Sequence, residues 1–268
     1  MSKSNAAVRV CYWGLSVARH VCLGLQGLVP LIALLSIWQV LGPSRSPYFP
    51  PPSEWGAALL DRAAAGDLLP AALMTFQSVA EALAFATALG VGIGGLIGTS
   101  PFLARCLGPT LEFLRTLPPP AIVPVAALII GVNNSMKLFV ITFAAFWPIL
   151  LNTTSGARSL HPTLLDAART MQLDAIARTT KIFLPALLPA ILTGVRVAAP
   201  LAIIVSLLAE MLTLMPGLGA LLLMAQRNFN AAEVFGLLVA VGSFGFILNA
   251  ALAAFESWVL TPQGQTNF

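Results

Sequence analysis

Residues 187–209 read LLPAILTGVRVAAPLAIIVSLLA, an apolar run that contains a single charged residue, Arg196. About 20 apolar residues in a helix span the hydrocarbon core of a bilayer. In lipid, a helix is also the one open-ended element that satisfies its own backbone hydrogen bonds. This stretch therefore predicts a transmembrane helix.

Five more apolar runs lie along the chain, each long enough to cross a membrane. They lie at residues 21–41, 75–99, 111–131, 136–155 and 234–260. Of the 268 residues, 58% are hydrophobic and 9% are charged, whereas ordinary soluble domains carry about 25% charged residues. A water-soluble globule is therefore excluded. We expect an all-α integral membrane protein with about six transmembrane helices in a single domain, residues 1–268.

The segments between the runs predict the topology. Residues 1–20 form a basic N-terminal segment, and residues 42–74 combine a proline-rich stretch with a mixed stretch, Glu54 to Leu69, that is typical of an amphipathic surface helix. With the N-terminus in the cytoplasm, ten of the 14 Lys and Arg residues fall on the cytoplasmic side and four on the other. Because cytoplasmic loops carry the excess of basic residues, we expect both termini inside and residues 42–74 outside.

The third run contains Pro118, Pro119 and Pro120, with Pro124 shortly after them. Three consecutive prolines remove three backbone donors, so a continuous helix must break or kink there. Two interpretations stay open. Either protein or a water-filled cavity covers a true break, or the prolines make a simple kink between two packed half-helices.

The second run contains closely spaced glycines. They are Gly90, Gly92, Gly94, Gly95 and Gly98. Because small residues let two membrane helices approach closely, we expect this face to pack against another helix rather than to bind a ligand.

The most polar stretch, residues 158–183, lies between the fourth and fifth runs, on the side assigned to the cytoplasm. Leu164, Leu165 and Ala168 would share the apolar face of a short amphipathic helix, and Asp174 is placed to cap a second one. A short turn would join the two helices. Composition alone also permits a solvated loop with incidental helix.

Asp166-Ala167-Ala168 and the terminal Ile182-Phe183-Leu184-Pro185 match the EAA and I-x-LP elements of a known pattern at its spacing. The stretch thereby resembles the EAA loop of bacterial binding-protein-dependent ABC importers. Two positions depart from the family pattern. Asp166 replaces the glutamate, and Gln172 stands where the family has a glycine, which makes a left-handed turn costlier there.

Further segments extend the resemblance from about residue 30 to residue 260. They are Pro50 to Ser53, Arg115 to Pro124, Phe146 to Thr153 and Leu184 to Arg196. Together they look like the nitrate, sulfonate and taurine branch of these permeases. The resemblance implies the type I ABC importer permease fold and a multi-pass location in a bacterial inner membrane.

In that family the loop forms coupling helices, residues 158–183 here, which sit in a groove of each ATPase subunit. Carried over position by position, the resemblance implies an ATPase-coupling site. Its members are Leu164, Leu165, Asp166, Ala167, Ala168, Met171, Gln172, Leu173, Asp174, Ile182, Leu184 and Pro185. The implied partners are a second copy of the permease in a homodimer, two ATP-binding cassette ATPase subunits and an external solute-binding protein.

The chain itself lacks the usual ATP-binding motif. A phosphate-binding GxxxxGK[ST] loop needs a lysine directly after glycine, whereas Lys3, Lys137 and Lys181 follow Ser, Met and Thr. The three cysteines and two histidines show no metal-binding or catalytic spacing. We therefore expect no enzyme activity and no cofactor in this chain, with ATP and magnesium bound by the partner ATPase.

Polar side chains at membrane depth are candidates for the transport pathway or its gate. They are Glu81, Trp147, Asn152 and Glu210. The polar neighbours of Glu81 favour an interfacial position, and packing is the simpler interpretation of Asn152. Glu210 precedes Met215-Pro216-Gly217-Leu218-Gly219, which resembles the family's outer gate region. Glu210 therefore either helps to close the pathway or marks where the helix reaches water.

Two functions remain in view. The first is the permease subunit of an ABC importer, which works by alternating access and transports a small solute of the nitrate, sulfonate or taurine type. The second is a secondary transporter driven by an ion gradient, with Glu81 and Glu210 as coupling carboxylates. The second would work without a partner and predicts inverted repeats, which the sequence does not display.

Overall fold

The computed structural model describes residues 29–42, 46, 48–160, 170 and 174–260. Within these residues the chain is helical and has no strand. An apolar helix, Val29–Leu41, comes first. The labelled elements are α2 (Pro52–Ala64), α3 (Leu68–Thr99), α4 (Pro101–Arg115), α5 (Pro119–Ile130), α6 (Asn134–Ser159), α8 (Ala175–Arg178), the π-helical turn η1 (Thr179–Phe183), α9 (Leu184–Thr213), α10 (Leu218–Arg227) and α11 (Ala231–Leu260).

Four of the described helices are long and apolar enough to cross a membrane. They are α3, α6, α11 and the helix Ile176–Thr213, which includes η1 and α9. The pair α4 and α5 makes a fifth if it is counted as one bent span. The predicted first span, 21–41, falls partly outside the described residues, which include Val29–Leu41 of it. The all-α membrane class is confirmed, and the number of six spans stays approximate.

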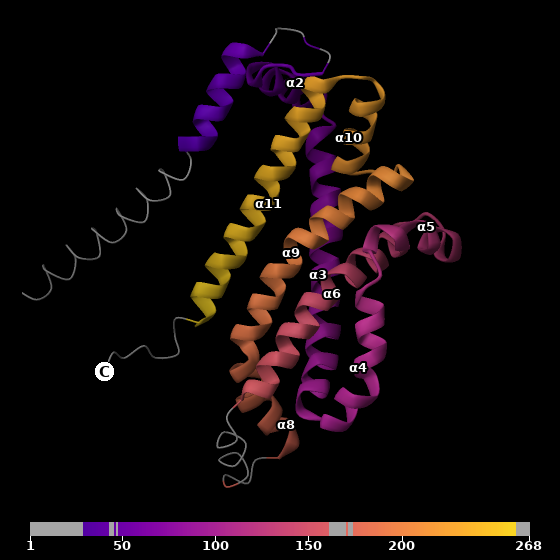
Figure 1. Ribbon diagram of the computed structural model, residues 1–268, viewed down its shortest axis with the longest axis vertical. Coiled ribbons are helices and arrows are strands. Elements are labelled where there is room, and N and C mark those ends of the chain that lie inside the picture. Colours follow the sequence, from indigo (N-terminus) through magenta and orange to yellow (C-terminus); the bar gives the residue numbers. More distant parts are fainter. Residues whose placement is uncertain (1–28, 43–45, 47, 161–169, 171–173, 261–268) are drawn as a thin grey trace, which may run out of the picture.

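The central layer consists of α3, α6 and α9, which run side by side (Figure 1). Their contact faces carry buried side chains such as Val79 on α3, Ile141 on α6 and Ala198 on α9. On the outside of this layer, α11 packs along α9 and α10, and only Gly236 and Leu237 of α11 are buried. The molecule therefore has a tightly packed centre and a peripheral helix that exposes most of its apolar surface.

Glycines let α3 and α6 approach closely, as predicted. A Cβ added at Gly90 would lie 2.8 Å from Cγ2 of Ile149, and one at Gly94 would lie 2.8 Å from the carbonyl oxygen of Leu150. Gly98 is in equally close contact with α6. Gly92 faces open space, so the prediction is wrong for this glycine. The packing face follows the spacing of four residues that brings side chains to one side of a helix.

The proline break separates two helices. α4 ends at Arg115, α5 begins at Pro119, and the chain bends by 93° between them. Pro118 is extended, and Pro119 takes the first helical position, where its missing N–H would be unpaired in any case. The predicted break is confirmed. The simple kink is wrong, because α5 turns away from α4 (Figure 1), and the predicted bounds 111–131 leave out the start of α4 at Pro101.

The segment predicted outside the membrane, 42–74, contains α2 and also the first turns of α3, which begins at Leu68 rather than at residue 75. α2 is fixed to the start of α11. The ring of Trp55 stacks on Phe235 with centroids 4.9 Å apart, and Nε of Arg62 lies 2.9 Å from Glu233. The amphipathic helix is therefore part of the folded domain.

Candidate functional site

A buried ion pair joins two of the central helices. Nζ of Lys137, in the first turn of α6, lies 2.6 Å from Oε1 of Glu210, in the last turn of α9. Lys137 is 2% exposed and Glu210 is 0% exposed. A single buried charge is strongly unfavourable unless a partner neutralises it. Each residue therefore depends on the other for its place in the core.

Further donors complete the hydrogen bonding of Glu210. The hydroxyl of Thr75 on α3 donates to Oε1 at 2.8 Å, and the N–H of Gly219 donates to Oε2 at 2.7 Å. The buried hydroxyl of Ser206, one turn earlier on α9, also donates to Oε1, at 3.3 Å. Because Gly219 lies in the first turn of α10, the carboxylate sits at the positive end of that helix dipole. Thr75, Lys137, Glu210 and Gly219 are called the Glu210 network below. This network connects α3, α6, α9 and α10.

The turn between α9 and α10 is built around this carboxylate. A Cβ added at Gly217 would overlap the carboxylate of Glu210. The N–H of Leu218 donates to Oγ1 of Thr75 at 3.0 Å, so the same hydroxyl accepts from the turn and donates to Glu210. The turn is thereby held against α3, and moving the turn away from α3 breaks the hydrogen bond from Leu218.

The network corrects one inference from the sequence. Glu210 does not mark the point where a helix reaches water, because its side chain is fully buried. The sequence also gives no partner for Lys137 or Thr75, whereas the structure joins both to Glu210. Opposite charges at the ends of two apolar runs were the available signal, since such charges usually pair with one another.

A polar cavity of about 270 Å³, called the outer cavity below, lies beside the Glu210 network. Its lining residues come from one face of α3, the first turns of α6 and the turn before α10. They are Met74, Gln77, Ser78, Glu81, Asn134, Lys137, Leu138 and Pro216. Oε1 of Glu81 accepts a hydrogen bond of 2.8 Å from Nε2 of Gln77. The fold thus brings Glu81 to the same cavity as Lys137.

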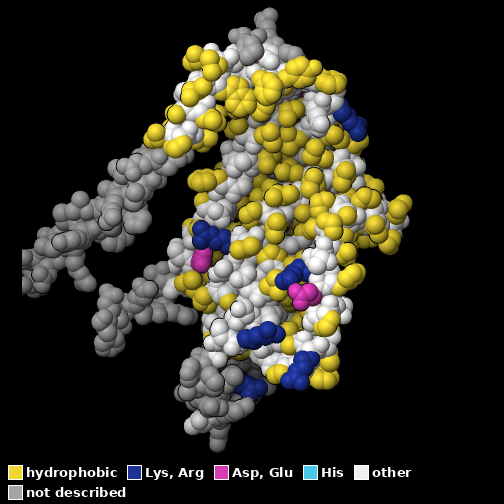
Figure 2. Space-filling view, viewed as in Figure 1, with side chains coloured by type: hydrophobic (Ala, Val, Ile, Leu, Met, Phe, Trp, Pro, Cys, Tyr) yellow, Lys and Arg dark blue, Asp and Glu magenta, His cyan; other side chains and the backbone are white. Residues whose placement is uncertain are grey.

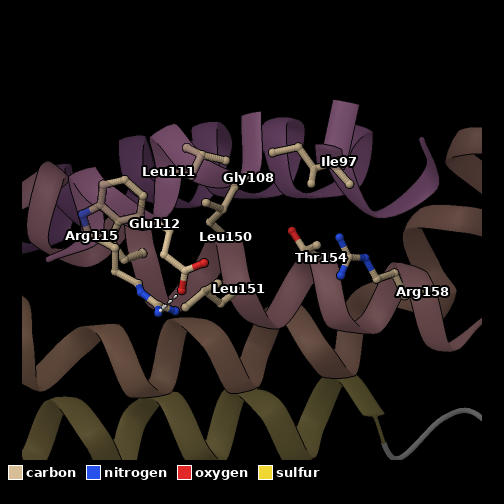
Figure 3. A pocket seen from close by; sticks show the side chains of 11 residues that line it. Ile97, Gly108, Leu111, Glu112, Arg115, Leu150, Leu151, Thr154 and Arg158 are labelled. Carbon is tan, nitrogen blue, oxygen red and sulfur yellow. Dashed lines mark hydrogen bonds and ion pairs between the residues drawn. The ribbon is translucent and has the colours of Figure 1, made fainter. Parts of the chain in front are cut away.

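A second cavity, of about 200 Å³, lies toward the other end of the molecule, between α4 and α6 (Figure 3). Arg115 and Glu112 form an ion pair of 2.9 Å at one end of it, and Arg158 lies at the opposite end. Trp147 lines this cavity and is 7% exposed. Its Nε1 has no hydrogen-bond partner among the described residues. Trp147 therefore lines a different cavity from Glu81 and Lys137.

Asn152 lies at the crossing of α6 and α9 rather than in either cavity. Its Nδ2 donates to the carbonyl of Pro148 at 2.8 Å, and a Cβ added at Gly194 would lie 3.2 Å from its own Cβ. This placement agrees with packing. Arg196, the single charged residue of the run 187–209, lies 3.4 Å from Glu256 of α11 and remains half exposed.

Much of the predicted ATPase-coupling site lies outside the described residues. These positions are Leu164, Leu165, Asp166, Ala167, Ala168, Met171, Gln172 and Leu173. Oδ1 of Asp174 accepts a hydrogen bond of 3.2 Å from the N–H of Ala177, so Asp174 caps α8 as predicted. Ile182 lies in η1, and Leu184 and Pro185 begin α9. α8 therefore continues through the π-helical turn η1 into the spanning helix α9. Such π-helical turns are common at functional sites.

Comparisons with known proteins identify the family. Residues 86–260 match the family described as "Binding-protein-dependent transport system inner membrane component". A nitrate import permease of Leptolyngbya laminosa is 32% identical over 189 residues, covering 70% of this chain and 68% of the relative. A bicarbonate transport system permease of Synechococcus elongatus is 28% identical over 245 residues, covering 87% and 88%. A probable ABC transporter permease of Brucella melitensis is 28% identical over 241 residues, covering 88% and 96%.

The matched residues run from the middle of α3 to the end of α11 and include Lys137 and Glu210. The proline break and the helices α6, α9 and α10 all fall within this region. The chain therefore belongs to the inner-membrane permease family of binding-protein-dependent ABC importers, in the branch that includes nitrate and bicarbonate permeases, and has the type I permease fold.

Proposed function

We propose that this chain works as a homodimer that forms the translocation path of an ATP-driven importer for a small solute. Two ATP-binding cassette subunits bind ATP and magnesium on the cytoplasmic side, and a solute-binding protein delivers the solute outside. Closure of the ATPase subunits changes which side of the path is open. The binding energy of ATP is used for this two-state rearrangement and not for chemistry in this chain.

The orientation has both termini in the cytoplasm. On the face drawn in Figure 2, Lys and Arg side chains gather toward the end of the molecule that carries α8. The excess of basic residues on the cytoplasmic side supports placing α8 and residues 158–183 inside. The Glu210 network and α2 then lie in the outer half.

The Glu210 network is the observation that carries this proposal. It holds the turn before α10 against α3 and α6 through a buried ion pair and two backbone N–H groups. A turn that is packed and held by buried charges can switch between two discrete arrangements, one with these contacts made and one with them broken. We assign this turn as the outer gate, with Glu210 as the residue that closes it. Trp147 lines the second cavity, between α4 and α6, and Asn152 positions α6 against α9.

The solute is a small molecule of the nitrate, sulfonate or taurine type. The relatives named for nitrate and bicarbonate import support a small solute. An ion-gradient mechanism with Glu210 as a coupling carboxylate is not favoured, because Glu210 is already neutralised by Lys137. The family match points the same way.

Co-purification from the native host tests this proposal. The tagged chain in mild detergent should bring down an ATP-binding cassette ATPase, and the complex should hydrolyse ATP faster when the solute-binding protein is added. Uptake by the isolated chain in liposomes with an ion gradient alone would contradict the importer.

The variant Ala168→Glu tests the coupling loop within this experiment. A charged side chain at Ala168, in the apolar face that the sequence predicts, should release the ATPase and abolish uptake, while the permease still inserts. Ala64→Glu is the matched control, because Ala64 is exposed at the end of α2. Normal uptake by Ala168→Glu would remove the coupling assignment.

A further inference from the structure

The outer cavity offers more hydrogen-bonding groups than its own residues use. An ammonium group has three donors, and Lys137 gives one of them to Glu210. The carboxylate of Glu81 accepts from Gln77, which leaves one of its oxygens without a partner among the described residues. The amide of Asn134 likewise makes no side-chain hydrogen bond within the described part of the chain. Three polar groups from two helices therefore have capacity for a ligand.

The helical spacing shows that this polar lining is one continuous surface. Met74, Gln77, Ser78 and Glu81 follow one another at three or four residues, so they share one face of α3. The first turns of α6 and Pro216 close the other sides. Pro216 belongs to the turn that the Glu210 network holds. One wall of the cavity is therefore part of the proposed outer gate.

The charges in and beside the cavity decide what it binds. Lys137 is neutralised by Glu210, whereas Glu81 makes no ion pair within the described residues. Among the described residues, the exposed carboxylate of Glu81 therefore has no counter-charge in the cavity. An inorganic anion would face this like charge, while an ammonium or another cationic N–H donor would be attracted to it.

We infer that the outer cavity is a solute contact site in which Glu81 accepts hydrogen bonds from an amine of the transported solute. Lys137 and Asn134 then donate to acceptor atoms at the other end of the same molecule. A cavity near the lower end of ligand pockets, about 300 Å³, suits a small solute. This inference rests on the proposed function and adds to it the chemistry of the solute end that the gate meets.

Saturation-transfer NMR with taurine as the probe tests the site. The measurement uses the wild-type permease with its co-purified ATPase in lipid nanodiscs. We expect a taurine signal that methylammonium displaces and that methanesulfonate and nitrate do not. In Glu81→Gln, the apparent Kd for taurine should rise at least tenfold. Glu112→Gln, the same change at the opposite cavity, should leave the Kd within twofold.

Three results would overturn the inference: no taurine signal with the wild type, an unchanged Kd in Glu81→Gln, or displacement by nitrate but not by methylammonium. If Glu81→Gln does not assemble, Ser78→Leu takes its place, because it fills the cavity without removing a charge and should weaken taurine binding equally. Recovery of the ATPase in the same preparation reports on the importer itself. The site can thus fail while the proposed function stands.

Discussion

Replacing Lys137 with methionine leaves the carboxylate of Glu210 buried without its counter-charge. Breaking a buried ion pair by removing one partner destabilises by about 3–5 kcal/mol. Because Thr75 and Gly219 still donate to the carboxylate, we expect the lower end, about 3 kcal/mol, for Lys137→Met. Glu210→Ala removes the acceptor of all these donors at once and should reach the upper end, about 5 kcal/mol.

Thermal unfolding of the purified protein in detergent measures these effects. In a domain of 150–250 residues, 1 kcal/mol shifts Tm by about 2–4 °C, so Lys137→Met should lower Tm by about 6–12 °C. The exposed Lys181 provides the matched control, and Lys181→Met should stay within about 0.5 kcal/mol of the wild type.

The double variant Lys137→Met with Glu210→Ala separates charge from packing. It leaves no unpaired buried charge, so its destabilisation should fall short of the sum of the single variants by about 3 kcal/mol, at the upper end of coupling energies for residues in contact. Additive losses, or a Tm for Lys137→Met equal to that of Lys181→Met, would refute the conclusion that this pair holds the turn in place.

Three further predictions concern other parts of the molecule. Gly217→Ala should destabilise the protein by about 1–3 kcal/mol and slow transport, because the added Cβ would overlap the Glu210 carboxylate. Its control is Gly92→Ala, which lies in open space within a helix and should be neutral or stabilising by up to about 1 kcal/mol. Equal Tm losses in the two variants would contradict the overlap at Gly217. Trp55→Ala should destabilise the protein by about 3–5 kcal/mol and expose α2 to proteolysis, since Trp55 is buried and its Nε1 donates to the carbonyl of Pro50 at 2.9 Å. The control is Trp258→Ala, at a residue that is 74% exposed, and it should leave the cleavage pattern unchanged. Asp174→Ala removes the cap of α8 and about 1 kcal/mol of local stability, which faster hydrogen exchange in α8 would reveal and unchanged exchange would disprove.

Features that depend on nearby residues were predicted well. The proline break between α4 and α5 follows from the missing donors of Pro118 to Pro120, whatever surrounds them. The cap at Asp174 depends on a backbone N–H three residues away. Helix ends were predicted less well: α3 begins at Leu68 and contains Pro70, because a proline in the first turn costs the helix no hydrogen bond.

The candidate site was predicted only in part. Glu81 and Glu210 were recognised as charges in apolar runs, yet nothing linked either of them to Lys137. The partners in the Glu210 network are far apart along the chain, with Thr75 135 residues and Lys137 73 residues from Glu210. Spacing and periodicity report on one helix at a time, so they cannot pair residues across helices.

The sequence by itself determined that this protein is a membrane-spanning helical bundle of the ABC importer permease type. The free energy of transfer from water to lipid is a property of each side chain, and these free energies add up along an apolar run regardless of neighbouring helices. Only the tertiary structure decided that Lys137 and Glu210 form one buried pair and that Glu81 shares a cavity with Lys137. The reason is that the partner of a buried charge is set by distance in space, which packing of α3, α6, α9 and α10 alone establishes.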